Sequence, residues 1–221
     1  MIPYKTQNDS HRELLWSIVR QRYEMLMPEL EICLGLDDSP LYNRARAINN
    51  AAQKASGDIF LITDADVVFP KSLIPKIIYV SGLYPWAVPF TRGLKLNRSA
   101  TERLIKDGIP EEPVVQDTDA EFIMPFAGPL MNIVTRESFE NIRGMDERFE
   151  GWGGEDDAMR ISLNAVCGQY CRIKGDIWHL WHQPAPILKE FYDQNCRLLD
   201  RYREAEGCRS EILKLISEKH Y

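Results

Sequence analysis

The stretch IFLITDAD (residues 59–66) decides the expected fold, because an apolar run of strand length ends abruptly in two aspartates. Four consecutive apolar residues favour a strand buried on both faces, as strands of parallel sheets are. Asp64 and Asp66 follow at the carboxyl end of that strand, where open α/β sheets bind ligands. A turn beyond the strand can aim both carboxylates at one cation such as Mg²⁺ or Mn²⁺. A solvated turn is the alternative interpretation.

The segments before this strand predict an alternation of strands and helices. A short strand is expected at residues 2–6, a helix from Ser10, a strand over 30–36 and a helix over 44–55. Ser10 and Glu13 have the spacing of a capping box, which marks a helix start. This β-α-β-α-β order predicts an α/β fold with an open, doubly wound sheet flanked by helices.

The segments after residue 66 are less regular. Residues 93–120 are polar and rich in charge, which favours an excursion or lid rather than core. From residue 187 the apolar residues recur every three or four positions, which predicts an amphipathic helix or helix pair able to contact a partner or a second copy. We therefore expect one domain over 1–185 and a helical extension over 186–221. Helices are also expected over 71–81, 136–141 and 155–166, a strand over 86–90, and a kinked apolar segment over 122–134.

The run WGGEDD (residues 152–157) is the most unusual stretch of the chain. Three adjacent carboxylates repel one another, unless they begin a helix whose dipole favours negative charge. In a functional interpretation, a sugar ring stacks on Trp152 while Glu155 or Asp156 holds its hydroxyl groups. A carboxylate beside an acceptor hydroxyl can also act as a general base.

The run WHLWH (residues 178–182) contains two of the four histidines of the chain. Imidazole and carboxylate groups together are good ligands for Mn²⁺ and other divalent ions. Residues three apart in a strand point to opposite faces, so we expect only one of the two histidines, His182, to bind a metal. A structural histidine is the alternative.

The expected helix over 44–55 carries two polar side chains near the predicted nucleotide side of the sheet. Arg44 could meet a diphosphate, and Asn49 could bind a ribose or the chain itself. A solvated face is an equally good explanation for the arginine.

Composition excludes several classes of protein. A net charge of −6 argues against a nucleic-acid partner. Five cysteines without CxxC spacing favour reduced thiols over a zinc site or a disulfide framework. No signal peptide and no apolar run long enough for a transmembrane segment is visible, so the cytoplasm is the expected location.

Taken together, these motifs resemble the GT-A nucleotide-sugar glycosyltransferases. IPYKT (residues 2–6) looks like the first strand of family-2-type enzymes, and Asp37-Asp38 looks like the carboxylates that hold uracil and ribose. RARAIN (residues 44–49) is similar to their K-x-x-A-L-N helix, with arginine in place of lysine. Asp64-Ala65-Asp66 matches the D-x-D motif that carries Mn²⁺ and, through it, the donor diphosphate.

The later motifs narrow the resemblance. GMDERF (residues 144–149), followed by WGGEDD, looks like the segment shared by β-1,4-galactosyltransferases, polypeptide N-acetylgalactosaminyltransferases and bacterial chondroitin-synthase-like enzymes. His182 falls where those enzymes place a third metal ligand. The resemblance covers residues 1–185 and implies transfer of a hexose or N-acetylhexosamine from a UDP-sugar to a hydroxyl acceptor.

The resemblance also implies roles for individual residues. Asp64, Asp66 and His182 would bind Mn²⁺ or Mg²⁺, and Asp156, assisted by Glu155, would be the general base of an inverting displacement. The implied contacts to donor or acceptor are Pro3, Lys5, Asp37, Asp38, Arg44, Asn49, Asp64, Ala65, Gly128, Trp152 and Gly154.

Two other functions share the expected sheet. A nucleotidyltransferase would usually carry a glycine-rich loop after the first strand, and residues 3–12 contain no glycine. A non-catalytic module that binds a sugar nucleotide would keep the fold without turnover, although every expected carboxylate is present in this chain.

Overall fold

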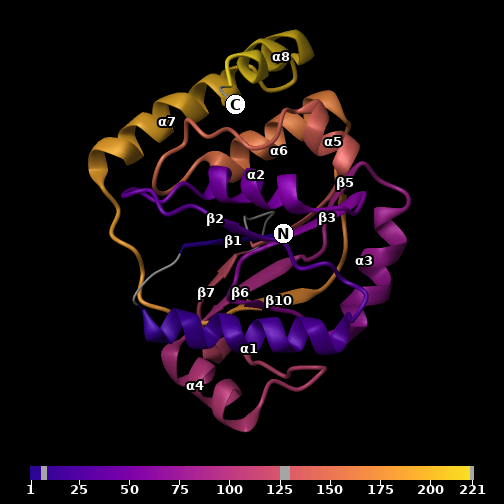
Figure 1. Ribbon diagram of the computed structural model, residues 1–221, viewed down its shortest axis with the longest axis vertical. Helices are drawn as coiled ribbons and strands as arrows, with labels where there is room; N and C mark the ends of the chain where they lie inside the picture. Colours follow the sequence, from indigo (N-terminus) through magenta and orange to yellow (C-terminus); the bar gives the residue numbers. More distant parts are fainter. Residues whose placement is uncertain (6–8, 125–129, 220–221) are drawn as a thin grey trace.

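The computed structural model describes residues 1–221 except 6–8, 125–129 and 220–221 (Figure 1). Gly128, expected to contact a ligand through its backbone, lies outside the described residues. The remaining chain forms a mixed α/β structure in which helices cover the sheets on more than one side.

The first half of the chain has the predicted β-α-β-α-β order. Strands β1 and β2 are parallel. The backbone nitrogen of Met1 donates to the oxygen of Leu61, and the nitrogen of Thr63 donates to the oxygen of Met1, so β3 joins the other side of β1. The elements are β1 (Ile2–Tyr4), α1 (Ser10–Leu26), β2 (Leu34–Leu36), α2 (Arg44–Lys54) and β3 (Ile59–Thr63).

The larger sheet continues from β3 in the order β3-β8-β5-β9. Strand β8 (Met131–Thr135) is antiparallel to both β3 and β5 (Trp86–Val88), and β9 (Cys171–Arg172) is parallel to β5. The sheet is therefore mixed. The expectation that β3 is a fully buried parallel strand is wrong, because one neighbour is antiparallel and Ile59 is 42% exposed.

A smaller sheet has the order β4-β10-β6-β7. Its strands are β4 (Val67–Val68), β10 (Asp176–His179), β6 (Arg92–Leu96) and β7 (Ala120–Met124). Strand β10 lies between β4 and β6, antiparallel to the first and parallel to the second. This pairing brings the end of β10 beside the chain that follows β3.

The smaller sheet corrects one expectation and bears on another. Residues 93–120 are not simply a lid, because Leu94 and Leu96 of β6 are fully buried and this strand pairs with β10. The helix α4 (Arg98–Asp107) and a short turn of 3₁₀ helix (Asp117–Asp119) complete this region. Of the kinked segment expected over 122–134, the described ends belong to β7 and β8, and residues 125–129, on which the predicted kink rests, lie outside the described residues.

Helix α1 lies across one side of the sheets, and α2 lies across the other (Figure 1). The side chain of Asp9 accepts hydrogen bonds from the backbone nitrogens of His11 and Arg12, so Asp9 is the N-cap. The expected capping box of Ser10 and Glu13 is wrong by one position, because the helix already includes Ser10. A turn of 3₁₀ helix (Lys71–Leu73) and α3 (Ile74–Ser81) lie beside the larger sheet.

The C-terminal segment forms the predicted helix pair. It follows α5 (Arg136–Asn141) and α6 (Glu155–Val166) and consists of α7 (Lys189–Glu204) and α8 (Arg209–Ser217). Both helices pack on α6. The apolar face of this segment, which we expected to contact a partner or a second copy, is therefore covered by the same chain. Its buried residues are Leu199, Tyr202, Ile212, Leu215 and Ile216.

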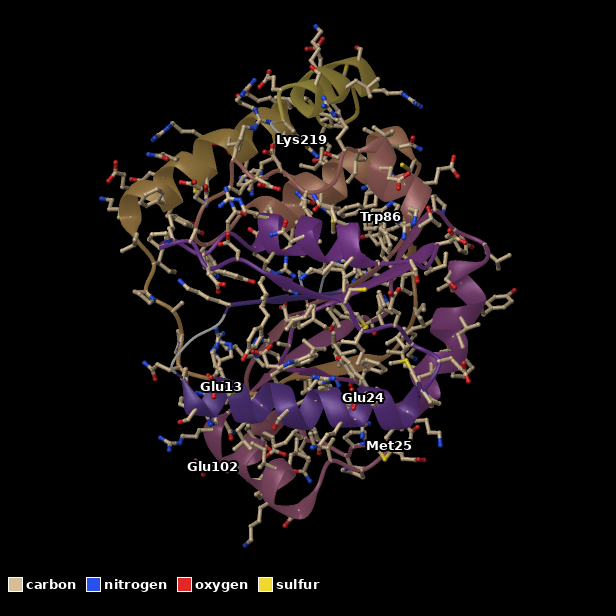
Figure 2. The ribbon with its side chains drawn as sticks, in the orientation of Figure 1. Glu13, Glu24, Met25, Trp86, Glu102 and Lys219 are labelled. Atoms are coloured by element: carbon tan, nitrogen blue, oxygen red, sulfur yellow. The ribbon has the colours of Figure 1, made fainter. Side chains whose placement is uncertain are left out.

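Polar contacts fix the end of the chain to the loop that precedes α6. Lys219 Nζ donates to the carbonyl oxygens of Ile142 and Gly144, each at 2.7 Å (Figure 2). The hydroxyl of Tyr202 donates to Asp146 at 2.7 Å.

Among the described residues, none of the helices is long and apolar enough to cross a bilayer.

Candidate active site

One cleft of about 440 Å³ collects side chains from the carboxyl ends of β1, β3 and β10, from the start of α1, and from the segment leading into α6. Most of the residues predicted to bind ligands line it. These are Pro3, Lys5, Arg44, Asp64, Ala65, Asp66, Trp152, Glu155, Asp156 and His182.

Three side chains of the cleft form a candidate metal site. His179 Nε2 lies 3.3 Å from Asp66 Oδ1, and His182 Nε2 lies 3.2 Å from Asp66 Oδ2. One ligand atom from each residue lies within 4.8 Å of the other two. None of the three residues is more than 9% exposed, yet Asp66 Oδ1 and His179 Nδ1 have no hydrogen-bond partner among the described residues. Buried polar atoms without partners are costly, so the cluster fits a bound cation.

Both histidines lie at this site, although the alternation of faces in a strand predicted that only His182 would bind a metal. Which of the two binds a metal stays a prediction. Strand β10 ends at His179, and the nitrogen of Leu180 donates to the oxygen of Asp66 at 2.9 Å. The nitrogen of Trp181 then donates to Thr101 Oγ1 at 2.8 Å. The chain has left the strand at that point, so the alternation of faces no longer separates the two imidazoles.

The protonation of the cluster suits metal binding. His182 Nδ1 lies 2.9 Å from the carbonyl oxygen of Gln183, which fixes Nδ1 as the donor and Nε2 as the acceptor. Nε2 accepts from Arg12 Nη2 at 2.9 Å in this structure, so a metal ion bound to Nε2 would replace that hydrogen bond. Burial lowers the pKa of His182, in spite of Asp66, and so favours the neutral imidazole. Burial alone would raise the pKa of Asp66, but His179, His182 and Arg12 lower it overall, and the carboxylate is ionised at neutral pH.

Arg12 is a cleft residue that no sequence motif singled out. Its Nη2 lies 2.9 Å from Nε2 and 3.1 Å from Nδ1 of His182. It stands in the first turn of α1, where a solvated arginine is the ordinary interpretation. Only the packing of α1 against the end of β10 shows that it belongs to the site.

Arg44 connects three further carboxylates of the cleft. Its guanidinium lies 2.8 Å from Asp64 Oδ1, 2.7 Å from Asp156 Oδ1 and 3.7 Å from Glu155 Oε1. Burial would lower the pKa of Arg44, but the three carboxylates together raise it. Asp64 therefore faces Arg44 and does not belong to the cluster of Asp66 and the histidines. Its predicted role as a metal ligand stays a prediction.

Asp156 combines burial with a shared cation. Burial raises the pKa of its carboxyl well above the usual value, and the neighbouring Glu155 and Asp64 add to that effect against the opposing Arg44. One guanidinium cannot neutralise three carboxylates. Asp156 shares Arg44 with Asp64 and Glu155, so its carboxylate is more basic than an ordinary aspartate. A carboxylate of raised pKa at a cleft is suited to accepting a proton.

Two glycines allow the chain to enter α6 beside the cleft. Gly153 and Gly154 have φ values of 97° and 99°, and a Cβ on Gly154 would lie 2.7 Å from the ring of Phe149. Gly154 is thus needed for the backbone and does not line the cleft. Trp152, directly before the two glycines, is 60% exposed. Its ring stacks on Tyr192 of α7 at a centroid distance of 5.9 Å.

Asn195 supports this segment from behind and was not selected from the sequence. Its Nδ2 donates to the carbonyl oxygens of Glu150, at 2.9 Å, and Trp152, at 3.2 Å. In the sequence it is one polar position within an amphipathic helix. It becomes significant only because α7 packs against the segment before α6.

Three predicted ligand contacts lie away from the cleft. Asp37 is buried and accepts hydrogen bonds from Ser39 and from the backbone nitrogen of Asn43, while Asp38 is exposed on the neighbouring turn. The amide of Asn49 binds the backbone of Met145 and, at 2.8 Å, Glu147 Oε1. The structure brings neither Asp37 nor Asn49 to the metal cluster, since internal partners already occupy their polar atoms.

The chain has the GT-A fold of glycosyltransferases. The catalytic domain of Drosophila β1,4-galactosyltransferase 7, in complex with xylobiose, matches with a TM-score of 0.52 and 15% identity, over 88% of this chain and 78% of that one. A family model described as the N-terminal domain of galactosyltransferase matches residues 124–184. That range contains WGGEDD and both cluster histidines.

Two further solved structures are less similar. A mutant form of the same Drosophila enzyme, with manganese, UDP-Gal and xylobiose, has a TM-score of 0.45 and 19% identity over 86% of this chain and 76% of that one. Glucosyl-3-phosphoglycerate synthase from Mycobacterium tuberculosis, with Mg²⁺ and UDP, has a TM-score of 0.45 and 13% identity over 93% and 77%. None of the curated proteins matches the chain.

Proposed function

We propose that this protein is a metal-dependent glycosyltransferase that moves a hexose or an N-acetylhexosamine from a UDP-sugar to a hydroxyl group of a glycan or glycoconjugate. The observation that carries the proposal is the sharing of one cleft by two groups of side chains. Asp66, His179 and His182 form one group, and Glu155 and Asp156 belong to the other. The match of residues 124–184 to a galactosyltransferase domain supports this assignment.

The metal cluster is the proposed anchor for the diphosphate of the donor. One carboxylate and two imidazoles fit Mn²⁺ better than Mg²⁺, which prefers oxygen ligands in an octahedron. A divalent ion held there would offset the negative charge on the departing nucleotide. Arg12 adds positive charge beside that position, and Lys5 lines the same cleft.

Arg44 is proposed to connect the donor end of the cleft to the acceptor end. It contacts Asp64, which follows β3, and Asp156, which begins α6. Its position fixes the separation between the D-x-D motif and the base. Pro3 and Ala65 also line the cleft and are proposed to pack against the nucleotide.

Asp156 is proposed to take the proton from the acceptor hydroxyl as that oxygen attacks the anomeric carbon. The bond from oxygen to the anomeric carbon forms while the bond from that carbon to the diphosphate breaks, and UDP leaves. A single displacement of this kind inverts the anomeric configuration. The raised pKa of Asp156 and the exposed face of Trp152, on which a sugar ring could stack, support this arrangement.

A UDP-release assay tests the proposal against the two alternatives of a nucleotidyltransferase and a non-catalytic module. We expect release of UDP, not of inorganic pyrophosphate, from at least one UDP-sugar in a panel when Mn²⁺ is present. Asp156→Asn should reduce that rate at least about 100-fold, the low end of what a general base contributes. Asp157→Asn is the matched control, because Asp157 is the exposed member of the same triplet and forms its ion pair with Arg160 of the same helix. Equal rates for the wild type and Asp156→Asn would contradict the assignment of the base.

A further inference from the structure

Helix α3 is apolar on both of its faces, although it lies at the surface of the molecule. Lys76 is the one charged residue among its eight. Ile77 and Val80 are buried against the sheet, whereas Ile78 and Tyr79 point outward and are 67% and 71% exposed. A surface helix ordinarily places polar residues on its outer face, so this face lacks the pattern of one that meets only water.

The turn that follows α3 extends the apolar surface. Leu83 is 58% exposed, and Tyr84 is also exposed. The four residues Ile78, Tyr79, Leu83 and Tyr84 are here called the α3 ridge. Contiguous exposed apolar residues of this kind mark sites of contact with a protein or a membrane.

A hollow of about 450 Å³ lies beside the α3 ridge, and its charged lining is positive. Tyr79 borders it, and its charged lining residues are Lys76, Arg172 and Lys174, all basic. No ion pair joins any of these three to a carboxylate within the described part of the chain. The charged lining of the hollow is therefore all of one sign, although the net charge of the chain is −6.

We infer that the α3 ridge and this basic hollow bind an anionic lipid surface. Tyrosine suits the boundary between headgroups and acyl chains, because its ring is apolar and its hydroxyl is polar. Lysine and arginine can lay their aliphatic stems along apolar surface while their charged ends reach lipid phosphates. Apolar residues flanked by basic ones are the combination that holds a protein at such an interface.

A second copy of the chain fits this face less well. A two-fold symmetric contact would place the same patch against itself, and so would bring two sets of three cations together. The acid beside the α3 ridge is Glu137, which lines a neighbouring hollow with Leu83 and Tyr84. The inference does not depend on the proposed transferase activity. In Figure 1, α3 lies at the right-hand edge, whereas the segment from β10 to α7 that borders the cleft passes on the left.

Co-sedimentation of the full chain with lipid vesicles tests the inference. The probes are phosphatidylcholine vesicles with and without phosphatidylserine. We expect sedimentation with the anionic vesicles only, and release at high salt. The double variant Lys76→Glu/Lys174→Glu should lower the partition coefficient at least about 25-fold, since each basic residue near an anionic surface contributes roughly fivefold. Both lysines are exposed on the surface, so these changes leave the fold intact.

Matched variants separate this surface from general effects of charge and hydrophobicity. Lys106→Glu/Lys189→Glu makes the same charge change at exposed positions elsewhere and should leave vesicle binding unchanged. Ile78→Ser/Leu83→Ser should weaken binding at least about fivefold, whereas Met25→Ser/Leu213→Ser, at other exposed apolar positions, should not. Wild-type protein that stays in the supernatant with both kinds of vesicle overturns the inference. A dimer that Ile78→Ser/Leu83→Ser converts to a monomer would also overturn it, by assigning the ridge to a second copy.

Discussion

Arg44 Nη1 and Asp156 Oδ1 lie 2.7 Å apart, and this contact joins the first turn of α2 to the first turn of α6. The two residues are 112 positions apart in the chain. The same guanidinium also contacts Asp64, directly after β3. One cation therefore fixes the relative positions of three elements whose ends form the cleft.

Replacing Arg44 should destabilise the protein more than replacing an exposed arginine. In Arg44→Met the three carboxylates lose their common cation. The pair with Asp156 is part-buried, so the loss should exceed that of an exposed pair and stay below the about 3–5 kcal/mol of a fully buried one. Urea denaturation measures the change. Arg20→Met is the control, because Arg20 and Glu24 form an exposed pair whose loss should cost less than about 1 kcal/mol. Equal losses in the two variants would show that Arg44 does not hold these elements together.

The raised pKa of Asp156 predicts the direction of a pH effect on stability. Between its ordinary value of 3.8 and its higher value in the folded protein, the folded state binds more protons than the unfolded state. The free energy of unfolding contributed by this group is then highest at low pH and falls as pH rises through that window. Urea denaturation at a series of pH values should show a weaker fall in Asp156→Asn. An unchanged profile would mean that Asp156 titrates normally.

His179 should contribute to metal binding as strongly as His182. We expect His179→Ala to weaken Mn²⁺ binding about 100-fold or more, since even supporting residues of metal sites contribute roughly 10–100-fold. Isothermal titration with Mn²⁺ measures this without any substrate. His11→Ala is the matched control, because His11 Nε2 lies 3.0 Å from the oxygen of Trp181 and is not a member of the cluster. If both variants bind Mn²⁺ like the wild type, the cluster is not the metal site.

His179 should also decide between metals. His179→Asp replaces an imidazole with a second carboxylate, and harder oxygen ligands favour Mg²⁺ relative to Mn²⁺. The ratio of the two dissociation constants should therefore shift toward Mg²⁺ by about tenfold or more in this variant. A ratio that stays constant would indicate that His179 does not touch the ion.

Asn195→Ala should affect the acceptor more than the donor. Asn195 holds the carbonyls of Glu150 and Trp152, so its loss frees the segment that presents Trp152. Each buried carbonyl left without a partner costs about 1–3 kcal/mol. We expect a raised KM for the acceptor with unchanged UDP affinity, and no effect from Gln194→Ala at the adjacent exposed position. A rise in the UDP dissociation constant would contradict this role.

The sequence predicted elements whose pattern is local. The apolar run of β3 and the helical spacing of α2 are visible within a dozen residues, and α6 was expected over the residues it occupies. The D-x-D and WGGEDD runs indicated the cleft because each directly adjoins such an element. Their separation in the chain carries no information about distance, and the contact through Arg44 appears only in the structure.

Pairing between distant strands was beyond the sequence. Strand β10 enters between β4 and β6, and this placement brings His179 beside Asp66. The alternation of faces in a strand excluded His179 only because the end of β10 could not be located from its residues. Arg12 and Asn195 were missed for a related reason, since each lies on a helix whose partner is set by packing.

The central claim is that a metal held by Asp66 and the two histidines binds the diphosphate of a UDP-sugar. Calorimetric titration of UDP with and without Mn²⁺, on the wild type and on Asp66→Asn, tests it most directly. We predict UDP binding that requires Mn²⁺ and is lost in Asp66→Asn, but persists in Asp157→Asn. UDP binding that is equally strong without the metal, or unchanged in Asp66→Asn, would contradict the claim.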